Sequence, residues 1–219
     1  GAASQVHETA RPRALEFLAE YGFLVFFAIW VVFLALMTPL FLTPNNLILL
    51  LRQAAIFGIP AIGATFVMIL GELDISFGSV IGLAGSVGAG VMIAGADPIV
   101  GIIVAVVIGL IVGLINAFLV TVVRIPSVVA TLGMLGIVLG VGLLYTGGRS
   151  IFGSQLDPIL PLAQGWIGPI PVPVVILFIA YAIAWFVLTQ TRFGMHVYLT
   201  GDNPEAAFRA GIAVDRVRV

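Results

Sequence analysis

Hydrophobic residues gather into six long runs along the 219-residue chain, and short polar segments separate the runs. A helix of roughly 20 apolar residues is long enough to cross the ~30 Å hydrocarbon core of a bilayer. The pattern therefore predicts an all-α membrane protein, a polytopic helical bundle with six transmembrane spans. The predicted spans are Tyr21–Leu42, Asn46–Leu70, Val80–Ala96, Ile99–Val123, Ser127–Tyr145 and Val172–Thr189.

The polar segments divide the chain into three parts. Residues 1–20 form a polar N-terminal segment, residues 21–189 hold the six spans, and residues 190–219 turn polar and charged again. Pro60 falls inside the second span, where the missing amide hydrogen predicts a kink or a break. Gly109 and Gly113 in the fourth span have the spacing of small residues that let two helices approach closely.

The composition supports a membrane location and excludes several other classes. The chain is 61% hydrophobic and 9% charged, whereas a soluble domain has about 25% charged residues. With no cysteine, it can form neither disulfides nor thiolate metal sites. A net charge of −1 argues against nucleic acid as a partner. No phosphate-binding loop, zinc-binding helix motif or nucleophile elbow is present, so the sequence predicts neither an enzyme nor a metal or cofactor site.

Arginine residues predict the orientation of the spans. Six spans place both ends of the predicted bundle on one side, and arginines concentrate on the cytoplasmic side of membrane proteins. Seven arginines flank the side that carries the N-terminus, against two on the other side, so the N-terminus is predicted to be cytoplasmic. The first group is Arg11, Arg13, Arg124, Arg192, Arg209, Arg216 and Arg218, and the second is Arg52 and Arg149.

The segment Gly71–Ser79 carries two carboxylates, Glu72 and Asp74, between two apolar runs. An ionised carboxylate at the centre of a membrane helix costs about 2.5–3.5 kcal/mol, so a pair at that depth would indicate a proton or cation site. The arginine distribution instead places the segment at the cytoplasmic junction of the second and third spans, where a carboxylate costs little.

At this junction Asp74 or Ser76 is expected to cap the third span, and Gly71 and Gly78 to permit a sharp reversal of the chain. Glu72 is expected to be a solvated surface residue. The junction residues of interest are thus Asp74, Ser76 and Gly78.

The C-terminal segment predicts a turn at Gly201–Asn203 followed by a short helix. Asn203 is a good N-cap, Pro204 suits the first helical position, Glu205 lies where the helix dipole favours an anion, and Gly211 would end the helix. Such a helix is either an ordinary connector or a rigid element that inserts into a partner's groove. The small side chains that would keep its docking face slim are Ala206, Ala207 and Ala210.

Four stretches together resemble the ribose/xylose-type permeases of bacterial ABC importers. Thr191–Ile212 is similar to the cytoplasmic coupling segment of that family, and Gly71–Ser79 to its Gly-Gly-Ile-Asp-Leu-Ser-Val-Gly-Ser motif. Gly113–Gly133 and Thr146–Arg149 resemble the two blocks that follow, in the same order and spacing. Glu72 departs from the motif, which usually has glycine there, and Asp202 and Phe208 depart from the family's coupling segment.

This resemblance implies the N-terminal part of a type II ABC importer permease, in the bacterial inner membrane. Such a permease pairs with a second permease subunit, docks on a cytoplasmic ATP-binding subunit that hydrolyses ATP, and receives a monosaccharide from a periplasmic binding protein. Members of the family are typically longer, so the resemblance implies a truncated permease, either a fragment or one part of a split one.

The resemblance also suggests roles for individual residues. The coupling residues would be Gly201, Asn203, Glu205, Ala206, Ala207 and Gly211. A neutral sugar needs hydroxyl and amide partners, which makes Asn116, Ser127 and Thr131 candidates for the substrate pathway, although interhelical hydrogen bonding would explain them equally well. Two other classes stay open: an ion-coupled secondary transporter that uses Glu72 and Asp74, and a membrane scaffold subunit without transport activity.

Overall fold

The computed structural model describes residues 13–219, with side chains from Tyr21 onward. The predicted N-terminal segment, residues 1–20, and the side chains of Arg11 and Arg13 therefore lie outside the described part. The chain divides into two compact units, residues 1–50 and residues 51–219.

The first unit contains α1 (Arg13–Met37) and the first turns of α2 (Pro44–Ile69). On α1 the ring of Trp30 stacks between those of Phe26 and Phe33, with centroid separations of 6.5 and 5.4 Å. Most described side chains of α1 are exposed and apolar, as expected of a surface that meets lipid rather than water.

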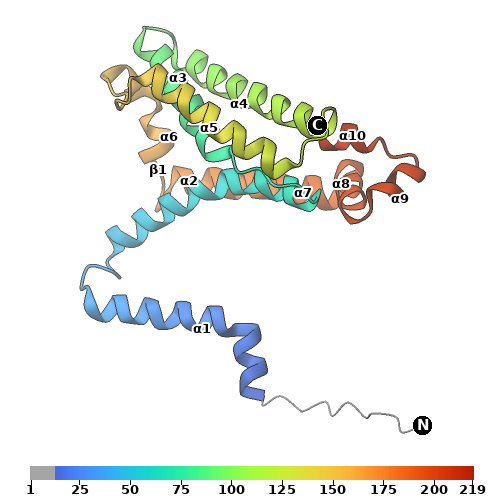
Figure 1. The fold of residues 1–219 in the computed structure, drawn as a ribbon. Coiled ribbons are helices and arrows are strands. Elements are labelled where there is room, and N and C mark those ends of the chain that lie inside the picture. The colour runs from blue at the N-terminus through green and yellow to red at the C-terminus, as the bar shows by residue number, and fades with distance from the viewer. Residues whose placement is uncertain (1–12) are drawn as a thin grey trace. The chain divides into compact units, whose positions relative to one another are not determined.

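The second unit is built from helices that reverse at short turns (Figure 1). α2 continues through Pro60 as one helix, so of the predicted kink or break the break does not occur. The other elements are α3 (Phe77–Ile93), α4 (Pro98–Thr121), α5 (Ser127–Thr146), η1 (Ser154–Ile159), α6 (Leu160–Gln164), β1 (Trp166–Ile167), β2 (Ile170–Pro171), α7 (Val172–Gln190), α8 (Arg192–Asp202), α9 (Pro204–Arg209) and α10 (Val214–Arg218).

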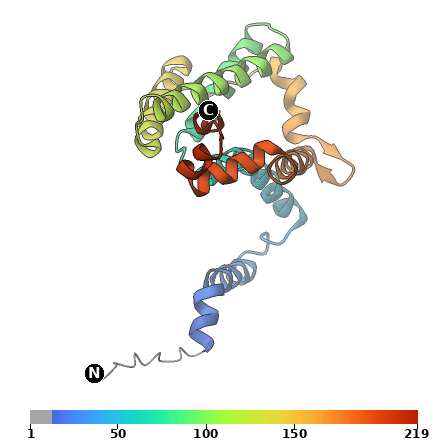
Figure 2. The same cartoon turned by 90° about the vertical axis from the view of Figure 1, so that its right-hand side faces the viewer.

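α3, α4 and α5 pack against one another, as two views of the fold agree (Figures 1 and 2). Their buried centre is Val112, Met134 and Val138. α3 and α4 cross in backbone contact at Gly88 and Gly101: a Cβ on either glycine would lie 2.7 Å from the carbonyl oxygen of the other. Small residues thus set the distance between these helices, which is the usual means of association in lipid.

Among the described residues, four helices are long and apolar enough by length and composition to cross a membrane: α2, α4, α5 and α7. The remaining predicted spans correspond to the apolar helical stretches Tyr21–Met37 and α3, which are shorter. The 17 residues of α3 cover about 25 Å at ~1.5 Å per residue. The count of six spans stays a prediction.

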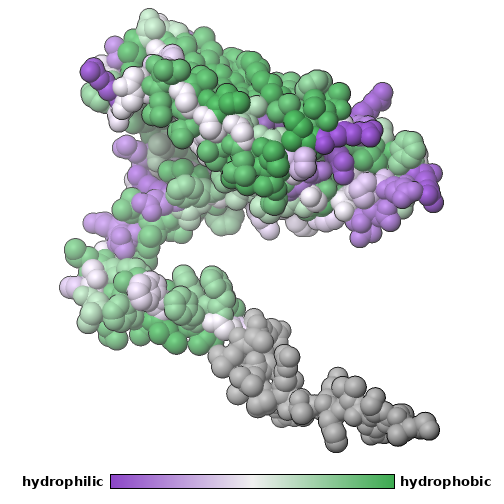
Figure 3. Space-filling view, in the orientation of Figure 1, coloured by the Kyte–Doolittle hydropathy of each residue, from purple (hydrophilic) through white to green (hydrophobic). Residues whose placement is uncertain are grey.

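Apolar side chains cover α3–α5, and polar ones gather toward α8–α10 (Figure 3). Residues 147–171 link α5 to α7 at the opposite end, where η1 touches α3 and α4. At that end Arg52 donates to the carbonyl of Gln164 (2.8 Å) and lies 5.0 Å from the ring centre of Trp166. Within residues 51–219, Arg52 and Arg149 therefore belong to one end, and Arg124, Arg192, Arg209, Arg216 and Arg218 to the other.

Candidate functional site

The carboxylate of Asp74 stabilises the loop that joins α2 to α3. Gly71 takes the left-handed conformation (φ 78°), which reverses the chain as predicted. Oδ1 of Asp74 accepts hydrogen bonds from both the backbone amide (2.7 Å) and the hydroxyl (2.6 Å) of Ser76. The hydroxyl of Ser76 therefore does not cap α3 itself. Gly78 takes no part in the reversal because it lies inside the first turn of α3.

The same loop is bonded to α4 and α5. Nδ2 of Asn116 donates to the hydroxyl of Ser76 (3.0 Å), and Ser76 is fully buried. Oγ of Ser127 accepts from the amide of Leu73 (3.1 Å), while Oγ1 of Thr131 contacts the carbonyl oxygens of Leu73 (3.2 Å) and Ser127 (2.8 Å). The three side chains proposed from sequence for a substrate pathway thus meet at one loop, and each makes a hydrogen bond from its own helix to that loop.

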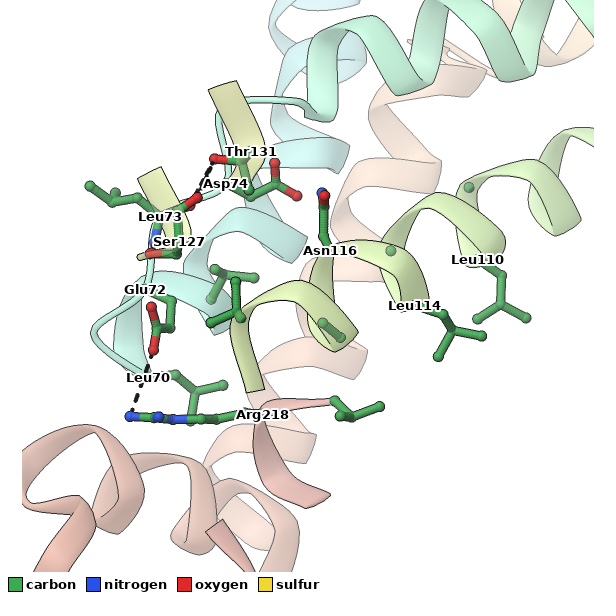
Figure 4. Close-up of a pocket in the computed structure, with 16 residues that line it drawn as sticks. Leu70, Glu72, Leu73, Asp74, Leu110, Leu114, Asn116, Ser127, Thr131 and Arg218 are labelled. Atoms are coloured by element: carbon green, nitrogen blue, oxygen red, sulfur yellow. Dashed lines mark hydrogen bonds and ion pairs between the residues drawn. The ribbon is translucent and has the colours of Figure 1, made fainter. Parts of the chain in front are cut away.

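These side chains also line one cavity of about 330 Å³, here called the Asn116 cavity (Figure 4). Small-molecule sites span about 300–1,000 Å³, so its size is at the lower end of that range. Asn116 is 7% exposed, and its Oδ1 has no partner among the described residues. The lining residues are Val67, Leu70, Glu72, Leu73, Asp74, Gly109, Leu110, Gly113, Leu114, Asn116, Ala117, Val120, Ser127, Thr131, Arg218 and Val219.

Gly109 and Gly113 have a different role from the one their spacing suggests. No atom of another element lies within 4 Å of a Cβ built on either glycine. Both residues line the Asn116 cavity. A close contact between α3 and α4 is made instead at Gly88 and Gly101.

Glu72 is not a solvated surface residue, contrary to the sequence-based expectation. Its carboxylate lies 3.6 Å from the guanidinium of Arg218 on α10, and the two side chains are 22% and 25% exposed. Figure 4 shows them facing each other at one side of the cavity. Neither Glu72 nor Arg218 could be assigned to this site from sequence, because their pairing requires the packing of α10 beside α4.

The C-terminal helices follow the predicted capping pattern. Oδ1 of Asn203 accepts from the amide of Ala206 (3.0 Å), Pro204 begins α9, and Gly211 ends this segment in the left-handed conformation (φ 85°). Glu205 lies in the first turn of α9 and pairs with Arg209.

Two coupling candidates have different surroundings from those predicted. Gly201 is not in a turn but inside α8, where a Cβ would overlap the carbonyl oxygen of Ile69 at the end of α2. Ala207 is 4% exposed and packs inward, so it cannot contribute to a docking face. The outward side of α9 carries Glu205, Ala206 and Phe208.

Comparison with known proteins identifies the family. A family model described as "Branched-chain amino acid transport system / permease component" matches residues 46–219. No solved structure matches the chain.

Among curated proteins, the ribose import permease protein RbsC of Bacillus subtilis (strain 168) is 39% identical over 192 residues, which cover 87% of this chain and 60% of the relative. RbsC of Haemophilus influenzae is 30% identical, with 97% and 67% covered. The D-allose transport system permease protein AlsC of Escherichia coli (strain K12) is 33% identical, with 90% and 61% covered.

The chain therefore spans about two thirds or less of the length of these relatives. The family model covers most of residues 1–219, and the helices are those of a multi-pass membrane protein. The chain belongs to the permease-component family of the branched-chain amino acid transport systems, which includes sugar import permeases.

Proposed function

We propose that this chain forms the translocation path of an ATP-binding-cassette importer for a monosaccharide or a similar small polyol. The similarity to ribose, allose and arabinose permeases carries this proposal. The ion-coupled alternative is not favoured, because the relatives are sugar import and ABC transporter permeases and both carboxylates of the loop have partners. Glu72 is paired with Arg218, and Asp74 accepts two hydrogen bonds from Ser76.

The Asn116 cavity is proposed as part of the path. The unpartnered Oδ1 of Asn116 can accept from a sugar hydroxyl, and the hydroxyls of Ser127 and Thr131 lie on the same cavity. Because all three side chains also bond the loop, each offers a solute few free groups. Contacts of this kind are weak, which suits a path from which the solute must depart.

The orientation follows from the arginines. The α8–α10 end, with five arginines against two at the other end, is proposed to be cytoplasmic. The N-terminus would then also be cytoplasmic and the chain would lie in the bacterial inner membrane. Residues 147–171 would face a periplasmic sugar-binding protein, and a second permease subunit would complete the path.

α9 is proposed to rest on a cytoplasmic ATP-binding subunit, which would hydrolyse the ATP. It is short, capped at both ends and exposes Phe208 (71%). A short helix that is capped at both ends can move as a rigid body. Closure of the ATPase would then tilt the spans.

The proposed activity is tested by co-expressing the permease that contains this chain with the ATP-binding subunit and the sugar-binding protein that co-purify with it. Uptake of ribose, allose, arabinose and leucine is measured in vesicles with and without ATP. ATP-dependent uptake of one sugar and none of leucine is expected. Uptake of leucine alone, or uptake driven by an ion gradient without ATP, would refute the proposal.

The contribution of the cavity is tested with Thr131→Val. Thr189→Val is a matched control, because both hydroxyls donate to the carbonyl four residues earlier, at 2.8 and 2.7 Å, while Thr189 is absent from the Asn116 cavity. We expect Thr131→Val to lower sugar uptake about tenfold, a change equal to about 1.4 kcal/mol. Equal uptake by both variants would remove Thr131 from the path.

The coupling role of α9 is tested with Glu205→Arg combined with Ala206→Trp, two exposed positions. Ser154→Trp, on the exposed surface of η1 at the other end, is the control for an added tryptophan. Co-purification of the ATPase should be lost in the α9 variant and kept in the control. Retention in both would show that α9 is not the docking helix.

A further inference from the structure

A second cavity of about 380 Å³ adjoins the first. It is called here the Pro126 cavity, and its lining residues are Glu72, Val120, Thr121, Arg124, Ile125, Pro126, Ser127, Asp215 and Arg218. Four of these, Glu72, Val120, Ser127 and Arg218, also line the Asn116 cavity. The Glu72–Arg218 ion pair is therefore part of the wall between the two cavities.

This pair is poorly bonded for groups so sheltered. The nitrogen and oxygen atoms are 3.6 Å apart, beyond the ~2.7–2.9 Å of a good charge-assisted hydrogen bond. Nε of Arg218 is buried and has no partner among the described residues. A sheltered ion pair stabilises a structure only when its geometry is excellent and its remaining donors are satisfied. Neither condition is met, so the attraction between the two side chains contributes little to holding them together.

The two partners are held by different parts of the molecule. Glu72 is on the loop that is fixed to α5 through the amide of Leu73 and the hydroxyl of Ser127. Arg218 is on α10, which contacts α8, α9 and α4. Ile212, which is 8% exposed, lies in the segment that joins α9 to α10, so a tilt of α9 would be passed to α10. Such a tilt would move Arg218 relative to Glu72.

We propose that the Glu72–Arg218 pair is a gate between the Asn116 cavity and the Pro126 cavity, and that displacement of α9–α10 opens it. The role of this gate rests on the proposed transport function: it would delay release of the solute until the coupling segment moves. The position of the ion pair between the two cavities does not depend on which solute passes.

The absence of cysteine from the sequence makes a thiol-labelling test clean. Val67→Cys places a thiol on the Asn116 cavity alone, and Ile125→Cys places one on the Pro126 cavity alone. Each reporter is introduced into the complete permease, with the native pair, with Glu72→Gln and with Arg218→Gln. Labelling rates are measured in vesicles with a membrane-impermeant maleimide that reaches the α8–α10 end.

Loss of either charge should raise the labelling rate of Val67→Cys about fivefold, a population change equal to about 1 kcal/mol. Labelling of Ile125→Cys should stay constant in every background, which also reports that the fold is intact. Exchange of the charges, Glu72→Arg with Arg218→Glu, should restore slow labelling at Val67→Cys. Unchanged labelling of Val67→Cys in both single variants would overturn the gate.

This assay needs no sugar, ATPase or binding protein. If uptake fails but labelling responds as expected, the gate stands and the assigned transport activity is wrong. If uptake succeeds but labelling does not respond, the transport activity stands and the pair is only a structural contact.

Discussion

The loops that precede α3 and α4 have the same local structure but different tertiary contacts. Each has a glycine in the left-handed conformation, Gly71 (φ 78°) and Gly95 (φ 97°). Each then has an aspartate whose Oδ1 accepts the amide two residues later: Asp74 from Ser76 at 2.7 Å, and Asp97 from Ile99 at 2.8 Å.

The difference lies in what packs over each loop. Asp97 is exposed and ordered by its own turn alone. Asp74 also accepts the hydroxyl of buried Ser76, which in turn accepts from Asn116 on α4. The same local chemistry is therefore a helix cap in one loop and the first member of an interhelical network in the other. Two things make this difference: the residue two positions after the aspartate, which is Ser76 in one loop and Ile99 in the other, and the position of the loop relative to α4 and α5.

The largest expected difference in the free energy of unfolding follows from replacing each aspartate by alanine. Asp74→Ala leaves the amide and hydroxyl of a fully buried serine without their acceptor, and we expect a loss of about 2–4 kcal/mol, because each unmet buried group costs about 1–3. Asp97→Ala removes one exposed cap, at a cost of about 1 kcal/mol. Thermal unfolding in detergent, followed by tryptophan fluorescence, measures both. Equal losses would erase the distinction between the loops.

Substitution of the left-handed glycine should have the same effect on stability in both loops. Gly71→Ala and Gly95→Ala each place a side chain in the left-handed region, at a cost of about 1–2 kcal/mol. No neighbour lies within 4 Å of either Cβ, so only backbone strain is tested. Gly82→Ala, inside α3 and equally free of neighbours, is the control and should stabilise the helix by about 0.5–1 kcal/mol. The same unfolding assay applies, and unequal losses at Gly71 and Gly95 would show that the turns themselves differ.

The smallest expected effect concerns the bond between Ser127 and the amide of Leu73, which has no counterpart at Asp97. Ser127→Ala should cost about 0.5–1.5 kcal/mol, the net value of one hydrogen bond. Faster hydrogen exchange of the Leu73 amide, with no change at Ile99, is the expected readout. Unchanged exchange at Leu73 would mean that α5 does not order the loop.

Much of the local structure was predictable. The cap at Asn203, the start of α9 at Pro204 and the reversal at Gly71 were confirmed, since each depends on a residue and its nearest neighbours. Predictions from local patterns were wrong where glycine occurs both in turns and inside closely packed helices. Gly78 resembles a turn glycine but lies within a helix, and Gly201 resembles one but permits α8 to approach α2.

By itself, the sequence determined the helical membrane class, the apolar helices and the division of arginines between the two ends, because hydropathy, capping and charge act over a few residues. Only the tertiary structure decided that Asn116 reaches Ser76, that Gly109 and Gly113 border a cavity, and that Glu72 faces Arg218. Those relationships depend on how closely helices approach at contacts such as Gly88–Gly101. Packing geometry of that kind leaves no periodic signal in the chain.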